Sequence, residues 1–329
     1  MTMEDSTKTN IEQVAELSTQ IIQEVEKAVV GKREVLQLMM AAFLSSGGHI
    51  LLEDYPGLAK TLIANSFSMA LGMQFKRIQF TPDLLPGDIT GGYVFESDQN
   101  RFMLRKGPIF THILLADEIN RASPKTQSAL LEAMQEYQVT LEGETMPLPD
   151  PFIVIATQNP IEYEGTFPLP EAQLDRFMVK LSVGYPSREE EDEILKRRAE
   201  RKKDIVPLQA IISPETFLAM RATVEDVYVD ADVRRYIVNL VAESRVRRQV
   251  SVGVSPRGSL ALLKLTRAWA AIQGRNFVTP DDVKQFIQPA LSHRIILEPS
   301  LWDIKKSENT VLAEVAQAVP VPVLKPEND

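Results

Sequence analysis

A lysine and a threonine, Lys60-Thr61, stand where an apolar run and a turn give way to a helical pattern. The run His49–Leu52 predicts a buried strand, residues 53–59 predict a loop, and apolar residues then recur at helical spacing from Leu62. In such a strand–loop–helix context, backbone N–H groups and a helix N-terminus can bind phosphate. The lysine can bridge the β- and γ-phosphates and the threonine hydroxyl can bind Mg²⁺.

The loop departs from the pattern G-x-x-x-x-G-K-[ST] at two positions. Asp54 stands where the first glycine belongs, and Ala59 stands where the second belongs. Either residue is tolerable if the backbone does not need a positive φ there. A surface turn that carries a Lys-Thr pair is therefore the alternative interpretation of the motif alone.

Two adjacent acids, Asp117 and Glu118, end a second apolar run, Thr111–Ala116. Because side chains alternate along a strand, the two carboxylates point in different directions at the edge where open α/β sheets bind ligands. One acid can hold Mg²⁺ through water while the other polarises an attacking water, which suits phosphoryl transfer. A strand that simply runs into a polar loop is the alternative.

A neutral amide, Asn159, follows a third apolar run, Phe152–Ala156. At the carboxyl edge of a sheet such an amide can hydrogen-bond both a γ-phosphate and a catalytic water. Turn formation before Pro160 would explain the residue equally well.

Three arginines could reach a phosphate. Arg176 lies in Leu174–Phe177, and from a neighbouring subunit it could contribute roughly 10³–10⁵ in rate. Arg257 follows the helix start Ser255-Pro256 and could reach nucleotide between two domains, and Arg121 is a further candidate for contact with a neighbour. Internal salt bridges or surface positions are the alternatives.

The elements that must position these residues alternate between strands and helices in the first half of the chain, which predicts a parallel sheet with crossover helices. Gly184-Tyr185-Pro186 indicates a domain boundary, and a capping box at Ser187 starts the next helix. Beyond it the pattern is almost wholly helical, with Ser-Pro or Thr-Pro starts at residues 213, 255 and 279. The proline-rich tail from Pro320 is expected to be disordered.

Length and composition agree with this division. The chain has 329 residues, which predicts about two domains, and 44% hydrophobic residues, enough for a sizeable core. It has no cysteine, its three histidines are far apart, and its polar first ten residues lack a secretion signal, so a reducing cytoplasm is expected. No apolar run approaches the length of a membrane span. The net charge of −9 disfavours a nucleic-acid or anionic-lipid partner.

Four motifs occur in order along the chain. They are Tyr55-Pro56-Gly57-Leu58-Ala59-Lys60-Thr61, Leu115-Ala116-Asp117-Glu118-Ile119-Asn120-Arg121-Ala122, Ala156-Thr157-Gln158-Asn159-Pro160 and Leu174-Asp175-Arg176-Phe177. The set resembles the MoxR family of AAA+ ATPases, and the similarity covers about residues 29–299. The resemblance implies an α/β fold, with a parallel five-stranded AAA+ sheet core and flanking helices over residues 1–184. A smaller all-helical lid domain over residues 185–300 and a C-terminal segment, residues 301–329, would follow.

The resemblance also implies roles for single residues. Lys60 and Thr61 match Walker A, Asp117 and Glu118 match Walker B with Glu118 activating water, and Asn159 matches sensor 1. Arg176 matches the arginine finger, acting in trans, and Arg257 matches sensor 2. ATP would contact Val29, Val30, Tyr55, Pro56, Gly57, Leu58, Ala59, Lys60, Thr61, Leu62 and Asp117, with Val29-Val30-Gly31 packed on adenine. Mg²⁺ would be held by Thr61 and Asp117. Phe80–Val94 corresponds to the helix 2 insert and Val139–Pro149 to the hairpin before sensor 1.

The family implies a homo-oligomeric ring, commonly a hexamer, which hydrolyses ATP between subunits to remodel, mature or activate a client enzyme. A protein with a von Willebrand factor A domain is an expected partner. A magnesium-chelatase-like subunit, a nucleic-acid motor and a nucleotide-gated scaffold without useful hydrolysis are the alternatives.

Overall fold

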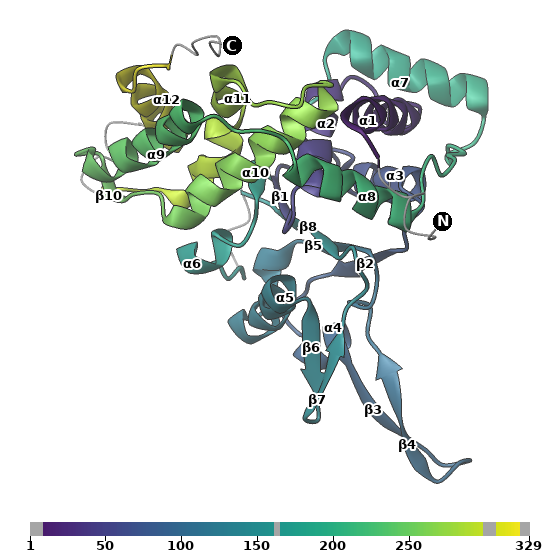
Figure 1. Cartoon of the computed structure of the whole chain (residues 1–329). Helices are drawn as coiled ribbons and strands as arrows, with labels where there is room; N and C mark the ends of the chain where they lie inside the picture. The colour runs from purple at the N-terminus through teal and green to yellow at the C-terminus, as the bar shows by residue number, and fades with distance from the viewer. Residues whose placement is uncertain (1–8, 161–164, 299–306, 323–329) are drawn as a thin grey trace, which may run out of the picture.

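The computed structural model of the chain describes residues 9–160, 165–298 and 307–322. Its centre is a five-stranded sheet in the order β2-β5-β8-β1-β9, and all neighbouring pairs are parallel (Figure 1). The strands are β1 (Ile50–Glu53), β2 (Phe75–Gln79), β5 (Ile113–Asp117), β8 (Ile153–Gln158) and β9 (Val179–Leu181). The predicted parallel five-stranded sheet is confirmed.

The three apolar runs, together with a fourth short run at Arg77–Gln79, predict four strands. These strands lie on β1, β5, β8 and β2, with ends that differ by up to two residues. The pattern did not single out β9, because this edge strand has only three residues and carries the half-buried Lys180 at its centre. Edge strands have one unpaired side, so a charged residue is compatible with their position.

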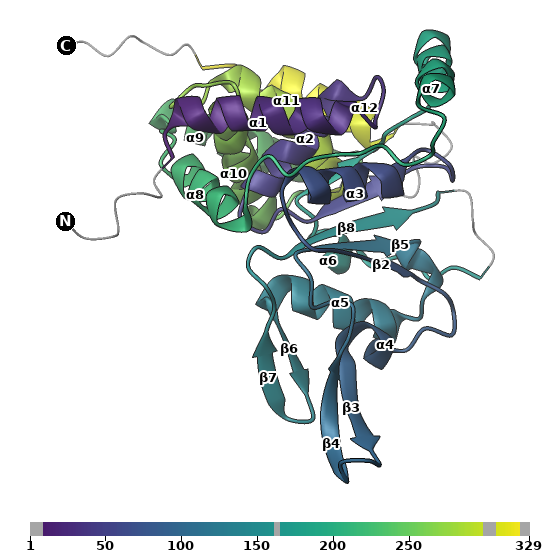
Figure 2. The ribbon, with the colours of Figure 1, turned by 90° about the vertical axis from the view of Figure 1, so that its right-hand side faces the viewer.

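Alternation along the strands divides the sheet's apolar residues between two clusters. Ile50, Leu52, Ile113 and Leu115 pack with helices α1 (Ile11–Glu26), α2 (Arg33–Leu44) and α3 (Lys60–Ala70) on one face. Leu51, Leu114 and Ala116 pack with helix α5 (Pro124–Glu136) on the other. The two-residue period of a strand therefore produces the helix–sheet–helix layering (Figure 2).

Two β-hairpins project from the α5 side of the sheet, away from α1 and α3 (Figure 2). The expected insert at Phe80–Val94 contains the short helix α4 (Pro86–Thr90) and then enters the hairpin of β3 (Gly91–Glu96) and β4 (Arg101–Lys106), so it runs further than the sequence suggested. The expected hairpin at Val139–Pro149 is β6 (Gln138–Leu141) with β7 (Glu144–Pro147).

The second half is helical, as predicted. It contains the exposed helix α7 and the packed helices α8–α11. Helices α7, α8, α10 and α11 begin at caps that the sequence identifies, Ser187, Ser213, Ser255 and Thr279, each of which accepts a backbone N–H. Their bounds are α7 (Arg188–Arg201), α8 (Pro214–Glu225), α9 (Ala231–Val246), α10 (Pro256–Ile272) and α11 (Pro280–Leu291), and an antiparallel pair, β10 (Val250–Val252) with β11 (Ile296–Leu297), accompanies them. Three short helices complete the described elements: α6 (Glu171–Leu174) and the 3-10 turns η1 (Ile119–Arg121) and η2 (Ser292–Arg294).

The C-terminal segment contains a helix that the sequence analysis did not expect, α12 (Glu308–Ala318). Its residues Val311, Leu312 and Val315 are buried in the apolar cluster that also includes α1, α2, one sheet face and α8–α11. The two predicted domains therefore share one cluster, and α12 packs on the helical part. The tail predicted to be disordered falls mainly on residues 323–329, outside the described residues. No helix among those described is long and apolar enough to cross a membrane.

The buried His49 lies just before β1 and makes stability depend on pH. Its Nδ1 accepts the Val154 N–H and its Nε2 contacts the Met134 carbonyl, at 3.0 Å each, so the ring is neutral. Burial lowers the pKa of His49 from 6.5 to about 4. The group therefore stabilises the fold above pH 6.5, and this stabilisation is lost as the pH falls toward 4, because the unfolded state takes up a proton first.

We expect the free energy of unfolding to fall by about 2 kcal/mol between pH 7.5 and 5 on account of His49 alone. Urea unfolding at both pH values measures this against His49→Gln, which lowers stability overall but should flatten the pH dependence by that amount. An equal pH dependence in both proteins would show that His49 is not the titrating group.

Candidate active site

The loop between β1 and α3 contains two residues in the left-handed conformation, Gly57 and Ala59. Gly57 has φ +84°, and a Cβ there would meet no atom within 4 Å. Ala59 has φ +56°, so the position does need the left-handed conformation, at a cost of about 1–2 kcal/mol for alanine. The sequence analysis accepted alanine at this position on the condition that no positive φ is needed there. The observed φ shows that a positive φ is needed. Because α3 starts at Lys60, its first N–H groups lack helical carbonyl partners and can bind an anion.

The ammonium of Lys60 is held over this loop. Its Nζ donates to the carbonyl oxygens of Asp54 at 2.7 Å and Tyr55 at 3.2 Å. Burial lowers the pKa of Lys60, and the negative charges of Asp54, Asp117 and Glu118 oppose that shift. Both hydrogen bonds go to neutral carbonyls, so a phosphate oxygen would be a stronger partner for this cation.

A cavity of about 450 Å³ opens over the carboxyl ends of β1, β5 and β8. It is lined by Pro56, Gly57, Leu58, Ala59, Lys60, Thr61, Leu62, Arg77, Gln79, Asp117, Glu118 and Asn159. The structure thus brings together the predicted phosphate loop, acidic pair and amide, which come from three separate strand ends. Tyr55 does not line this cavity; its exposed ring lies 6.1 Å from that of Tyr185, centre to centre.

The two acids have separate hydrogen-bond partners. Asp117 Oδ1 accepts the Thr157 hydroxyl at 2.6 Å, and Oδ2 accepts Arg77 Nη2 at 2.6 Å. Glu118 turns away from the strand with φ +55°, and its Oε2 accepts Gln79 Nε2 at 2.7 Å and Arg121 Nη1 at 2.9 Å. The two carboxylates therefore have different partners, but strand alternation is not the reason, because Glu118 lies beyond the end of β5 in the left-handed conformation.

Three site residues escaped the sequence analysis: Arg77, Gln79 and Thr157. Arg77 and Gln79 lie two apart at the end of β2, beside the end of β5, so their side chains share one face. Thr157 is buried, accepts the Glu118 N–H at 2.8 Å and bonds Asp117, so one hydroxyl orients both acids. These residues could have been found from the sequence, because they are polar residues at the ends of predicted strands. Polar strand ends were considered as site residues only for β5 and β8.

If the cavity hydrolyses a nucleotide with Mg²⁺, as the family resemblance implies, Thr157→Val should keep the fold and lower that activity about 10- to 100-fold. The chief reason would be a higher Mg²⁺ requirement, because an unsupported carboxylate binds metal less well. Steady-state hydrolysis as a function of Mg²⁺ measures the effect. Thr140→Val, on the exposed face of a hairpin, is the matched control. An unchanged Mg²⁺ dependence in Thr157→Val would contradict the orienting role.

The predicted adenine contacts lie elsewhere. Val29 is buried in the apolar cluster with α1 and α2, and Val30 is half-buried. Neither lines the 450 Å³ cavity. The next residue, Gly31, lies against the side chain of Glu190, so this segment borders the start of α7.

Arg176 and Arg257 share a second cavity of about 270 Å³ that contains none of the phosphate-loop residues. Arg257 Nη1 lies 3.7 Å from Asp175 Oδ2, and the other oxygen of Asp175 accepts the buried Arg294 at 2.8 Å. Among the described residues, Arg176 Nε is buried without a hydrogen-bond partner. The structure thus places Arg257 beside Arg176 and away from Lys60 of its own chain.

Comparison with known proteins agrees with this geometry. Residues 49–179 match the ATPase family associated with various cellular activities (AAA), and residues 242–315 match the AAA lid domain. Chaperone MoxR1 of Mycobacterium tuberculosis is 42% identical over 91% of this chain and 81% of its own length. The chain belongs to the MoxR family of AAA+ ATPases.

Two further proteins match almost the whole chain. The uncharacterized protein YeaC of Bacillus subtilis is 47% identical over 92% of this chain and 94% of its own. A crystal structure of a candidate ATPase from Cytophaga hutchinsonii has a TM-score of 0.89 at 38% identity and covers 95% of this chain and 97% of its own. A magnesium-chelatase subunit homologue of Methanocaldococcus jannaschii is more distant, 27% identical over 57% of the chain and 51% of its own. The MoxR similarity therefore includes the helical second half.

Proposed function

We propose that this MoxR-family protein binds ATP at the 450 Å³ cavity and hydrolyses it in a ring oligomer to remodel, mature or activate a client protein. The observation that carries the proposal is the convergence of Lys60, Thr61, Asp117, Glu118 and Asn159 on that one cavity. Lys60 and the loop N–H groups hold the phosphates, and Glu118 accepts a proton from the attacking water. Asn159 orients that water against the γ-phosphate.

The oxygen donors in the cavity suit Mg²⁺. The hydroxyl of Thr61 and the carboxylate of Asp117 are the kind of ligands this ion prefers, and it commonly keeps waters and phosphate oxygens for its other positions. Among the described residues, no cluster of three or more His, Asp or Glu offers an alternative metal site. Bound there, the ion would neutralise charge that develops on the phosphates. Because both oxygens of Asp117 already have partners, we propose that Asp117 holds the ion through water.

The placement of Arg176 and Arg257 supports action between subunits. Both side chains lie in a cavity separate from Lys60, so neither contacts a phosphate bound by the same chain. We propose that they act together on the nucleotide of a neighbouring subunit in a ring. The sequence analysis expected Arg257, as sensor 2, to reach a nucleotide between the two domains of its own chain. This proposal assigns it to the nucleotide of a neighbouring subunit instead. Arg121 contacts Glu118 within its own chain, so no trans role is proposed for it.

The β3–β4 hairpin supports a polypeptide partner. Phe95 and Phe102 are 49% and 68% exposed, and their rings pack edge-to-face with centres 5.3 Å apart. Exposed aromatic pairs on a projecting element are suited to gripping apolar segments of another protein. The client enzyme, the von Willebrand factor A partner and the hexameric ring stay predictions from the family resemblance. The cytoplasmic location stays a prediction from the sequence composition.

The test is an ATPase assay over a range of protein concentrations. The proposal expects Mg²⁺-dependent ATP hydrolysis whose specific activity rises with concentration, because the site needs two subunits. Stimulation by DNA that weakens steeply with salt would favour a nucleic-acid motor instead. Tight ATP binding without turnover at any concentration would favour a nucleotide-gated scaffold.

A further inference from the structure

The first position of the phosphate loop carries a carboxylate, Asp54, where the motif has glycine. The side chain is only 5% exposed, so the carboxylate points into the protein and does not line the nucleotide cavity. Burying a charge is costly unless it is well hydrogen-bonded. The contacts of this carboxylate therefore indicate what it does.

The Asp54 carboxylate binds the segment that follows β9. Oδ1 accepts the Ser182 hydroxyl at 2.7 Å and the Gly184 N–H at 3.2 Å, and Oδ2 accepts the Val183 N–H. One carboxylate thus satisfies two backbone donors and a hydroxyl from three consecutive residues. Charge-assisted bonds of this kind are about twice as strong as neutral ones.

The same residue contacts the catalytic lysine through its main chain. The Asp54 carbonyl accepts Lys60 Nζ at 2.7 Å, while the Asp54 N–H bonds the Gln158 carbonyl of β8 at 3.2 Å. Asp54 is therefore anchored to the sheet and connects Lys60 on one side with residues 182–184 on the other.

Residues 182–184 lead into the helical half of the chain. Gly184 has φ +68°, the next carbonyl, of Tyr185, accepts Lys32 Nζ at 2.9 Å, and Ser187 caps α7. The connection from β9 to α7 thus contacts both the phosphate loop and the segment before α2.

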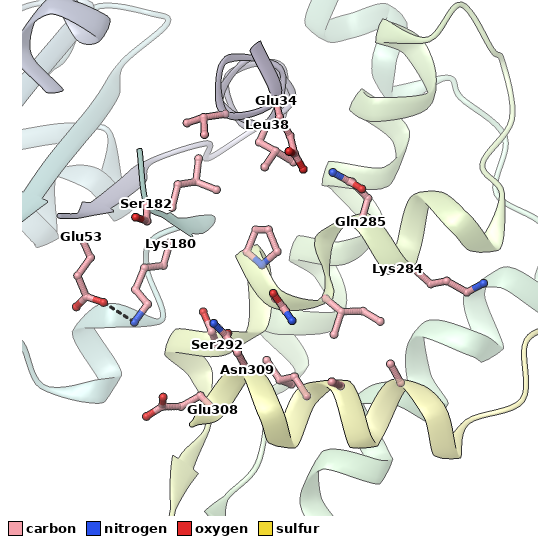
Figure 3. Close-up of a pocket in the computed structure, with 18 of the residues that line it drawn as sticks. Glu34, Leu38, Glu53, Lys180, Ser182, Lys284, Gln285, Ser292, Glu308 and Asn309 are labelled. Atoms are coloured by element: carbon pink, nitrogen blue, oxygen red, sulfur yellow. Dashed lines mark hydrogen bonds and ion pairs between the residues drawn. The ribbon is translucent and has the colours of Figure 1, made fainter. Parts of the chain in front are cut away.

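The surroundings leave this connection room to move on one side. Ser182 lines a cavity of about 950 Å³ between β9 and helices α2, α11 and α12 (Figure 3). In the same view, Lys180 of β9 pairs with Glu53 of β1 at 2.9 Å. The end of β9 is therefore held to β1 by backbone pairing and this ion pair, while the residues beyond it are held by Asp54.

We propose that Asp54 is a positioning residue that couples phosphate binding at Lys60 to the β9–α7 connection. A γ-phosphate draws the Lys60 ammonium away from the Asp54 carbonyl, and the carboxylate transmits the resulting shift of the loop to Val183 and Gly184. The coupling rests on the proposed ATP site. The hydrogen bonds from residues 182–184 to the Asp54 carboxylate, here called the Asp54 tie, are present without nucleotide. A separate measurement on nucleotide-free protein tests them.

Hydrogen exchange of the full chain, with and without MgATP, tests the proposal. In nucleotide-free protein, Asp54→Gly should exchange the Val183 and Gly184 amides about ten- to hundredfold faster, as loss of a hydrogen bond to a charged group implies. Ser182→Ala, a milder change, should raise the same rates less. In the wild type, MgATP should alter exchange over residues 183–190, and in Asp54→Gly this response should be lost.

Asp88→Asn is the matched control, because Asp88 also caps a backbone N–H, that of Leu85, but at an exposed position of helix α4. Unchanged exchange at Val183 and Gly184 in nucleotide-free Asp54→Gly and Ser182→Ala would show that the Asp54 tie does not hold residues 182–184 in place. Faster exchange with a wild-type response to MgATP would overturn the coupling. Failure of the wild type to bind MgATP, measured by calorimetry, would instead overturn the proposed function and leave the nucleotide-free result standing.

Discussion

Glu118→Gln is expected to bind ATP about as tightly as the wild type and to hydrolyse it about 10²–10⁴-fold more slowly. The amide has the size of the carboxylate and keeps an oxygen that can accept from Gln79 or Arg121, so the cavity keeps its shape. It cannot accept a proton from the attacking water, and this removes the general base. Phosphate release under saturating MgATP, together with nucleotide affinity by calorimetry, measures both effects.

A matched control for this variant is Glu136→Gln, which makes the same change at an exposed position near the end of α5. It should hydrolyse ATP like the wild type. Normal turnover in Glu118→Gln would show that another group activates the water. Loss of ATP binding would show that Glu118 shapes the cavity rather than the reaction.

Arg176→Ala is expected to lower ATP hydrolysis by roughly 10³–10⁵ while leaving nucleotide affinity within a few-fold. Arg176 shares a cavity with Arg257 and lies apart from Lys60, so the proposed action is on a neighbour's nucleotide. Mixing Arg176→Ala with Lys60→Ala should restore part of the activity. In such rings an intact Lys60 from one variant can meet an intact Arg176 from the other.

The control for the mixing experiment is Arg198→Ala, on the exposed helix α7, where the side chain pairs with the exposed Asp204. This variant should hydrolyse ATP like the wild type. Failure of the mixture to recover any activity, with oligomers shown to exchange subunits, would rule out action between subunits. Full activity of Arg176→Ala alone would show that Arg176 is not an arginine finger.

The sequence predicted the central part of this structure because strand ends and helix starts leave strong local signals. The apolar runs before Asp54 and through Ala116 identified β1 and β5, and Ser-Pro and Thr-Pro pairs identified the starts of helices α8, α10 and α11. Parallel strands bring their carboxyl ends to one edge, so Lys60, Asp117 and Asn159 could be expected to meet. Their common cavity agrees with that expectation.

What the sequence could not predict depends on contacts between distant residues. The partners of Asp54 at residues 182–184 follow an edge strand too short to recognise, so a carboxylate in the phosphate loop appeared only as a departure from the motif. Likewise, the side on which Arg257 lies depends on how the helical half packs against α1 and α2, through one shared apolar cluster that local periodicity does not describe. Helix α12 was not predicted, because the helical pattern was followed only to about residue 300 and the disordered tail was assigned from Pro320.

A structure of Glu118→Gln with MgATP tests the central claim most directly. The account predicts a triphosphate along residues 57–61 with Lys60 at its β- and γ-phosphates, magnesium near Thr61 and Asp117, and a neighbouring subunit's Arg176 facing the γ-phosphate. A nucleotide bound outside the 450 Å³ cavity would contradict it, as would a ring in which Arg176 faces away from every bound nucleotide.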